Sequence, residues 1–167
     1  MRFKLRFLFI LLFLTGCAVG PFGGPSEQKQ PVALSVNNSA NVTQTFEVWV
    51  ATSEANVTIR LNDSRTINTS ISQGLTTASS GDYYYYTAVE PSHSAQIHGR
   101  FTVEPGEERQ RSIENFSLNS AVVVVLYQDN KSGWWASAYC SDGALIGLEV
   151  TSRPDQYSDA EAGYGCR

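Results

Sequence analysis

The chain has 167 residues, of which 42% are hydrophobic and 17% charged, and its formal net charge is −4 with a sequence pI of about 5.1. This apolar content is enough for a folded core, so the composition excludes a wholly disordered chain, and the length predicts one domain. The acidic balance argues against nucleic-acid binding, which needs a basic surface, and no apolar run reaches the roughly 18 residues of a membrane span.

Residues 1–16 have the pattern of a lipoprotein signal peptide. Three basic residues precede the apolar segment 7–14, which is too short to cross a bilayer of about 30 Å. The segment runs into Leu14-Thr15-Gly16-Cys17, which resembles the lipobox of prokaryotic lipoproteins. That resemblance implies cleavage after residue 16 and a lipid on Cys17. The alternative is an ordinary secretory signal with a cysteine near its end.

A mature chain beginning at Cys17 would be an acidic protein anchored to the membrane. Cleavage removes three cations and no acids, so the net charge of −4 becomes −7. A two-chain lipid would anchor the protein stably, because each buried CH₂ contributes about 0.8 kcal/mol and one chain alone is marginal. Residues 17–30, rich in Gly and Pro, are predicted to form a flexible tether with a reach of about 20 Å. We therefore expect the protein on the external face of the cell membrane.

Residues 31–152 are predicted to form an all-β domain. Short β-branched and aromatic runs alternate there with Asn, Gly, Ser and Pro, and helical spacing is nowhere sustained. The spacing of the runs indicates a β-sandwich of seven to nine strands. Ala121–Tyr127 is apolar on both faces, which predicts the central strand. A loop of small residues is expected over 76–81, followed by a strand over 83–89.

Cys140 and Cys166 remain as an even pair once Cys17 is assigned to the lipid. Outside the cytosol such a pair is expected to form a disulfide, closing a loop of about 25 residues and tying the C-terminal tail 153–167 back to the domain. A cysteine metal site would need CxxC spacing, and a thiol nucleophile would need a supporting histidine pattern. Neither is present in the sequence.

Two stretches resemble the Ig-like modules of archaeal surface proteins. Residues 36–50 (VNNSANVTQTFEVWV) combine an Asn-rich turn with a Phe-x-Val-x-Val strand, and residues 101–113 (FTVEPGEERQRSI) contain a Pro-Gly-Glu turn. With its lipobox, Gly-rich tether and low Lys content, the whole chain resembles small haloarchaeal cell-surface lipoproteins, most of them of unassigned function. The resemblance implies an Ig-like antiparallel β-sandwich at the cell surface.

Asn-x-Ser/Thr sequons are the most specific surface signal. Seven of the nine asparagines begin one: Asn37, Asn41, Asn56, Asn62, Asn68, Asn115 and Asn130. Residues of these types crowd β-turns, which accounts for part of the enrichment. Alternation along the strands predicts that most of these side chains point outward, whereas Asn115 has the parity of Ile113 and is expected to point inward unless the strand has ended. We predict an N-glycosylated exterior, which favours an archaeal host.

Patterns for catalysis or metal binding are weak. His93 and His98 would lie on opposite faces of a strand, which does not suit a shared metal. The sequence contains no Gly-x-Ser-x-Gly motif, and the carboxylates around Pro105-Gly106 fit a solvated turn. We therefore expect no enzymatic activity, no metal and no cofactor.

Aromatic side chains are the remaining candidates for binding. A strand over 83–89 would present two of the four consecutive tyrosines on each face, and Trp134 and Trp135 would point to opposite faces. We take Tyr84, Tyr86, Trp134 and Trp135 as candidate binding residues, because rigid rings give contact area at low entropic cost. The alternative is that these rings are covered by the core or the tail.

The sequence thus predicts a lipid-anchored, N-glycosylated, non-catalytic module that contacts an envelope protein or a glycan. The alternative is an extracellular solute-capture or hydrolytic lipoprotein. A pocket holding two or more buried ionisable groups would favour the alternative, and exposed aromatic rings would favour the binding module.

Overall fold

The computed structural model describes residues 29–81, 83–128, 131–153 and 159–167. The predicted signal peptide 1–16, the predicted lipidation site Cys17 and the tether up to residue 28 lie outside this part of the chain. The described residues are all-β. They contain no helix of the length and apolar character that a membrane span requires.

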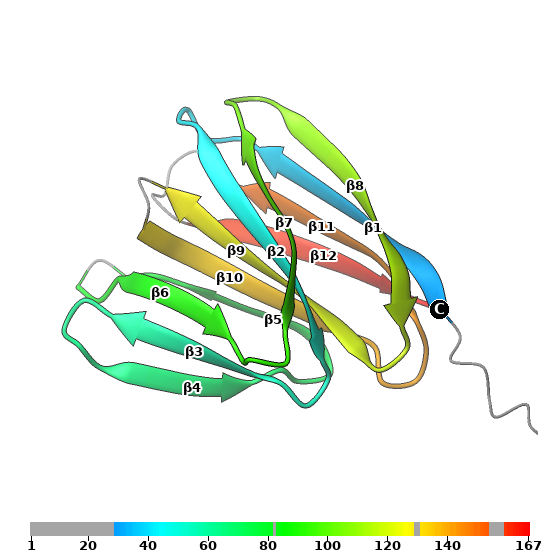
Figure 1. Ribbon diagram of the computed structural model, residues 1–167. Coiled ribbons are helices and arrows are strands. Elements are labelled where there is room, and N and C mark those ends of the chain that lie inside the picture. Colours follow the sequence, from blue (N-terminus) through cyan, green and yellow to red (C-terminus); the bar gives the residue numbers. More distant parts are fainter. Residues whose placement is uncertain (1–28, 82, 129–130, 154–158) are drawn as a thin grey trace, which may run out of the picture.

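Twelve strands form three sheets, which we call A, B and C (Figure 1). Sheet A has the order β12-β11-β1-β8 and consists of β1 (Lys29–Asn38), β8 (Glu108–Ser117), β11 (Leu145–Ser152) and β12 (Ala160–Cys166). Sheet B has the order β5-β10-β9-β2-β7 and consists of β2 (Gln44–Thr52), β5 (Gly74–Ser79), β7 (Gln96–Val103), β9 (Ser120–Gln128) and β10 (Lys131–Tyr139). Sheet C has the order β4-β3-β6 and consists of β3 (Asn56–Leu61), β4 (Thr66–Ser70) and β6 (Tyr86–Pro91). Neighbouring strands are antiparallel except β1 and β11, which run parallel.

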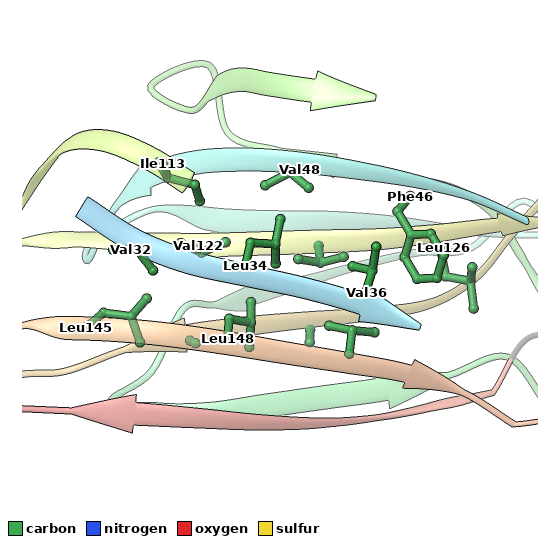
Figure 2. Close-up of a cluster of buried hydrophobic side chains, with 14 of the residues drawn as sticks. Val32, Leu34, Val36, Phe46, Val48, Ile113, Val122, Leu126, Leu145 and Leu148 are labelled. Atoms are coloured by element: carbon green, nitrogen blue, oxygen red, sulfur yellow. The ribbon is translucent and has the colours of Figure 1, made fainter. Parts of the chain in front are cut away.

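Sheets A and B face each other across the larger hydrophobic core. Alternate residues of β1 (Val32, Leu34 and Val36) point toward Phe46 and Val48 of β2, and all five are buried (Figure 2). This pattern follows from the two-residue period of a strand, since every second side chain reaches the same face. The two sheets thus form the predicted β-sandwich.

Sheet C covers the other face of sheet B. Val57, Ile59 and Leu61 of β3 pack against Val123 and Val125 of β9 in a second core. Strand β9 is consequently buried on both faces, and its residues 121–126 are all inaccessible to solvent. The prediction that the run 121–127 forms the central strand is confirmed, and its continuous hydrophobicity results from lying between two layers.

Several predicted boundaries were wrong. The described residues form twelve strands rather than seven to nine, partly because the expected loop over 76–81 contains most of β5. The predicted C-terminal tail 153–167 contains β12, and the last two residues of the predicted tether begin β1. The expected strand over 83–89 begins only at Tyr86. Residues 83–85 instead form a turn before it.

A bulge in β8 explains the orientation of Asn115. Val32 pairs with Ile113 and Gln30 with Phe116, so two residues of β8 lie opposite the single residue Pro31. Asn115 takes a φ of 56°, a left-handed conformation that asparagine adopts more readily than most residues. Ile113 and Phe116 can therefore both enter the core, while Asn115 is exposed.

Candidate functional site

Residues 83–85 between β5 and β6, which we call the tyrosine turn, form the most exposed aromatic group in the described structure. The exposed fractions are 87% for Tyr83, 52% for Tyr84 and 39% for Tyr85. Exposed aromatic rings of this kind are characteristic of recognition surfaces, in which a rigid ring supplies contact area with few torsions to restrict.

The tyrosine turn is fastened to the β3–β4 turn by Asn62. The backbone N–H of Asn62 donates to the Tyr85 carbonyl at 3.1 Å. Its side-chain Nδ2 donates to the Tyr83 carbonyl, and its Oδ1 accepts from the Tyr85 N–H, both at 3.3 Å. One asparagine therefore makes three hydrogen bonds across the turn, which holds the backbone beneath the exposed rings.

Two cations approach the rings of the tyrosine turn. The Arg65 guanidinium lies 4.4 Å from the ring centre of Tyr84, and the Lys131 ammonium lies 5.0 Å from that of Tyr85. Cation–π contacts at such exposed positions contribute about 0.5–1 kcal/mol each. Arg65 is itself held by an ion pair with Asp63. The site therefore combines rings and positive charge from three chain segments far apart in sequence.

Three of the four candidate binding residues are buried, which excludes them from an exposed binding surface and agrees with the alternative that the core covers these rings. Trp134 points into the core between sheets A and B, and Trp135 points into the core between sheets B and C. Tyr86, the first residue of β6, also belongs to the second core. Tyr84 is exposed as predicted. The tryptophans do face opposite ways, but both faces of β10 are covered because sheet B is the middle layer.

A second group of polar residues lies on the face of sheet B that looks toward sheet C. The buried carboxylate of Glu47 accepts a hydrogen bond from Trp49 Nε1 at 2.8 Å and lies 3.7 Å from Arg100. The Arg100 guanidinium lies 5.1 Å from the ring centre of Tyr127. Burial, together with the negative charge of Glu47, raises the pKa of Tyr127 to about 12. The carboxylate is thus paired with an N–H donor and a cation, and these contacts link β2, β7 and β9 within sheet B.

The sequon asparagines are mostly at the surface. Asn41, Asn56, Asn62, Asn68 and Asn115 are exposed, Asn37 is half-buried in β1, and Asn130 lies outside the described residues. Two sequons on the outer face of sheet C interlock: Thr58 Oγ1 donates to Asn68 Oδ1, and Ser70 Oγ donates to Asn56 Oδ1, both at 2.9 Å. These bonds use the amide oxygens, so the structure is compatible with modification at the nitrogens.

The structure contains the predicted disulfide between Cys140 and Cys166. It joins the end of β10 in sheet B to the end of β12 in sheet A. A cavity of about 250 Å³ beside it is lined in part by Tyr139, Tyr164 and Asp142. His93 and His98 are both exposed, and among the described residues no group of three or more His, Cys, Asp or Glu side chains is placed to hold a metal ion.

Sequence reasoning missed the partners of the tyrosine turn. The sequence indicates Asn62 as a sequon and as part of a hairpin turn, but no local pattern connects it, Arg65 or Lys131 to residues 83–85. The signal that could have helped is the run of four tyrosines, which has no apolar alternation and therefore does not fit a half-buried strand.

Comparison with known proteins adds no functional information. No family model and no curated protein matches the sequence. A solved structure named "Trapped Toxin" resembles this chain with a TM-score of 0.34 and 6% sequence identity. The similarity covers 83% of this chain but only 24% of that one. Similarity at this level supports no argument about function.

Proposed function

We propose that this protein is a lipid-anchored, N-glycosylated surface module that binds an envelope protein or a glycan through the tyrosine turn, without catalysis. The observation that carries the proposal is the presence of three consecutive exposed tyrosines on a backbone held by Asn62. Such rings supply contact area and lose little entropy on binding, which suits a recognition surface.

The position of the tyrosine turn suits a module held at a membrane. β1 begins at one end of the molecule, where the C-terminus also lies, whereas the β3–β4 turn and the start of β6 lie at the opposite end (Figure 1). A tether entering at β1 would therefore present the tyrosine turn away from the membrane. At about 3.3 Å per residue, the ten-residue β1 alone spans roughly 33 Å.

The Ig-like character of the sandwich belongs to the same proposal. The segments that carry the resemblance, residues 36–50 and 101–113, provide the end of β1, most of β2 and parts of β7 and β8. They lie in the two sheets that enclose the larger core, which is the part of the fold that an Ig-like module would share.

The contact function is tested by photo-crosslinking on intact cells of the natural host. A photoreactive residue at position 84 should give a discrete crosslinked species, because the Tyr84 ring lies in the proposed contact. The same group at position 164 provides a matched control, since Tyr164 is also an exposed tyrosine (43%) but lies in β12. Equal crosslinking from both positions, or no discrete product from position 84 whether or not the Asn62 sequon is intact, would refute the proposal.

The anchor is tested separately with the substitution Cys17→Ser. We expect the variant to be released from membranes and to lack the mass of a lipid, because the thiol that would carry the acyl or isoprenoid chains is gone. Cell fractionation and intact-mass measurement provide the readouts. Membrane retention of the variant without a lipid mass would contradict a lipid anchor on this residue.

A further inference from the structure

The sequon Asn62-Asp63-Ser64 lies directly beside the tyrosine turn. Its asparagine is the residue that bonds to Tyr83 and Tyr85, so the side-chain amide is within hydrogen-bond distance of the backbone that carries the exposed rings. The side chains of Asn56 and Asn68 accept from Ser70 and Thr58 instead, and within the described structure they make no hydrogen bond to the tyrosine turn. The side-chain amide of Asn62 is therefore both the predicted glycosylation site and a support for the backbone of the proposed binding surface.

The geometry of the amide leaves room for a sugar. A side-chain amide nitrogen carries two hydrogens, and the bond to the Tyr83 carbonyl at 3.3 Å uses one of them. N-glycosylation replaces a single hydrogen on Nδ2, so Oδ1 can still accept from the Tyr85 N–H, and the backbone N–H of Asn62 keeps its bond to the Tyr85 carbonyl at 3.1 Å. Asn62 is exposed, so a sugar on Nδ2 would extend into solvent next to the rings.

We infer that a glycan on Asn62 covers the tyrosine turn, so that the occupancy of this sequon regulates the binding surface. The inference rests on the proposed function and adds its regulation. Glycosyl transfer forms a bond between Asn62 Nδ2 and the anomeric carbon of a sugar from a phosphate-activated glycosyl donor. The bond from that carbon to the donor's phosphate breaks, and the phosphate leaves together with the proton lost from Nδ2.

The chemistry of the rings favours contact with the attached sugar. A pyranose presents C–H groups that pack on the electron-rich face of an aromatic ring. Tyr83 and Tyr84, at 87% and 52% exposure, are the most accessible rings of the turn, and the Tyr83 carbonyl accepts the bond from Nδ2. Because the sugar is covalently attached, its local concentration at the rings is high, and even a weak contact is populated.

The test measures the chemical accessibility of the tyrosines. The chain is produced in a host that performs N-glycosylation, as the natural sequence and as Ser64→Gly, which removes the sequon but keeps Asn62. Ser64 has a φ of 69°, a conformation that glycine adopts freely, so this substitution should not disturb the turn. Ser117→Ala, which removes the Asn115 sequon instead, is the matched control. The same natural chain made without glycosylation provides a second comparison.

We expect tetranitromethane to nitrate Tyr83 and Tyr84 several-fold more slowly in the glycosylated natural chain and in Ser117→Ala than in Ser64→Gly or the unglycosylated chain. Tyr164 should react equally in all four, and peptide mass spectrometry measures each site. Two outcomes would overturn the inference: an Asn62 without glycan in the glycosylated preparation, or equal nitration of Tyr83 and Tyr84 with and without the glycan.

The two proposals fail in distinguishable ways. If Ser64→Gly exposes the tyrosines to nitration but position 84 still gives no discrete crosslink on cells, the proposed contact function is wrong and the covering by the glycan stands. If position 84 crosslinks equally in the natural chain and in Ser64→Gly, the contact stands and the regulation by Asn62 is wrong.

Discussion

Two buried side-chain amides show how differently a polar residue can be accommodated in the same core. Asn38 Nδ2 donates to the carbonyls of Val42 and Val103 at 2.9 and 2.8 Å, and its Oδ1 accepts from Ala40 N–H and Ser152 Oγ. Gln44 is only 1% exposed, and neither Nε2 nor Oε1 has a hydrogen-bond partner within the described part of the chain. Asn38 therefore connects four segments, whereas Gln44 carries the desolvation cost of an unpaired amide.

Replacing Gln44 with leucine should stabilise the protein. A buried polar group without a partner costs about 1–3 kcal/mol, whereas an apolar side chain of similar size restores favourable burial. We expect Gln44→Leu to raise the free energy of unfolding by about 1 kcal/mol in urea titrations. The matched variant Asn38→Leu should lower it, because four hydrogen bonds are lost. Destabilisation by Gln44→Leu would show that the amide is paired in solution.

The Tyr127 phenol should lose its proton at a higher pH than an ordinary tyrosine does. Burial and the charge of Glu47 raise its pKa to about 12, so the native phenol keeps its proton at a pH at which an unfolded tyrosine, with a pKa near 10, has lost it. The native state then binds more protons than the unfolded state, and stability contributed by this group falls as the pH rises from about 10 to about 12.

Glu47→Gln should lower the pKa of Tyr127, because it removes a negative charge that opposes the phenolate. Difference absorbance of the phenolate, followed through alkaline titration, measures the change. Glu149→Gln is the control, since Glu149 lies in β11 of sheet A and should leave the titration unchanged. An identical titration curve for Glu47→Gln would contradict the electrostatic coupling of the two side chains.

At the scale of the strands, the bulge in β8 depends on the conformation of one residue. Asn115 holds a φ of 56°, which a β-branched side chain tolerates poorly and glycine tolerates well. We expect Asn115→Val to lower the free energy of unfolding by about 1–2 kcal/mol, and Asn115→Gly to change it little, in urea titrations. Both variants remove the sequon, so a glycan cannot explain a difference between them. Equal stability of the two would mean that the bulge relaxes.

Hydrophobic patterning in the sequence predicts strands that bury one or both faces, and it misses a strand that buries little apolar surface on either face. Val57, Ile59 and Leu61 alternate with polar residues, which fits the alternating burial of β3, and the uninterrupted run in β9 indicated a doubly buried strand. β5 was missed because GLTTAS consists mainly of small polar residues on an edge strand, which bury little apolar surface. The third sheet could not be predicted, because alternation identifies a buried face but not the layer that covers it.

The binding surface was the least predictable feature for a related reason. Whether an outward ring is exposed depends on what lies above it, and that is decided by tertiary packing. Trp134 and Trp135 alternate as expected, yet sheet B has a neighbour on each side, so both are buried. Tyr83–Tyr85 are exposed because they precede β6 rather than belonging to it. Asn62, 21 residues from Tyr83 in sequence, joins them only in the folded chain.

At the scale of the whole molecule, the Cys140–Cys166 disulfide connects the two sheets of the sandwich. The cysteines are separated by 26 positions, and the loop between them includes β11 and β12. β12 is an edge strand that pairs only with β11 among the described strands. In the unfolded state the disulfide keeps β12 near the rest of the chain, which reduces the conformational entropy gained on unfolding. The chain-entropy model assigns about 3–4 kcal/mol to a loop of this length.

The double variant Cys140→Ala/Cys166→Ala should therefore lower the free energy of unfolding by about 3 kcal/mol. It is made in the Cys17→Ser background so that no free thiol remains. Urea titration measures the loss, and dithiothreitol should reproduce it in the Cys17→Ser parent while leaving the double variant unchanged. The tyrosine turn lies at the end of the molecule opposite the C-terminus (Figure 1), so nitration of Tyr83 and Tyr84 in the folded protein should not respond to reduction. An unchanged unfolding midpoint under reduction would show that β12 is held by its strand pairing alone.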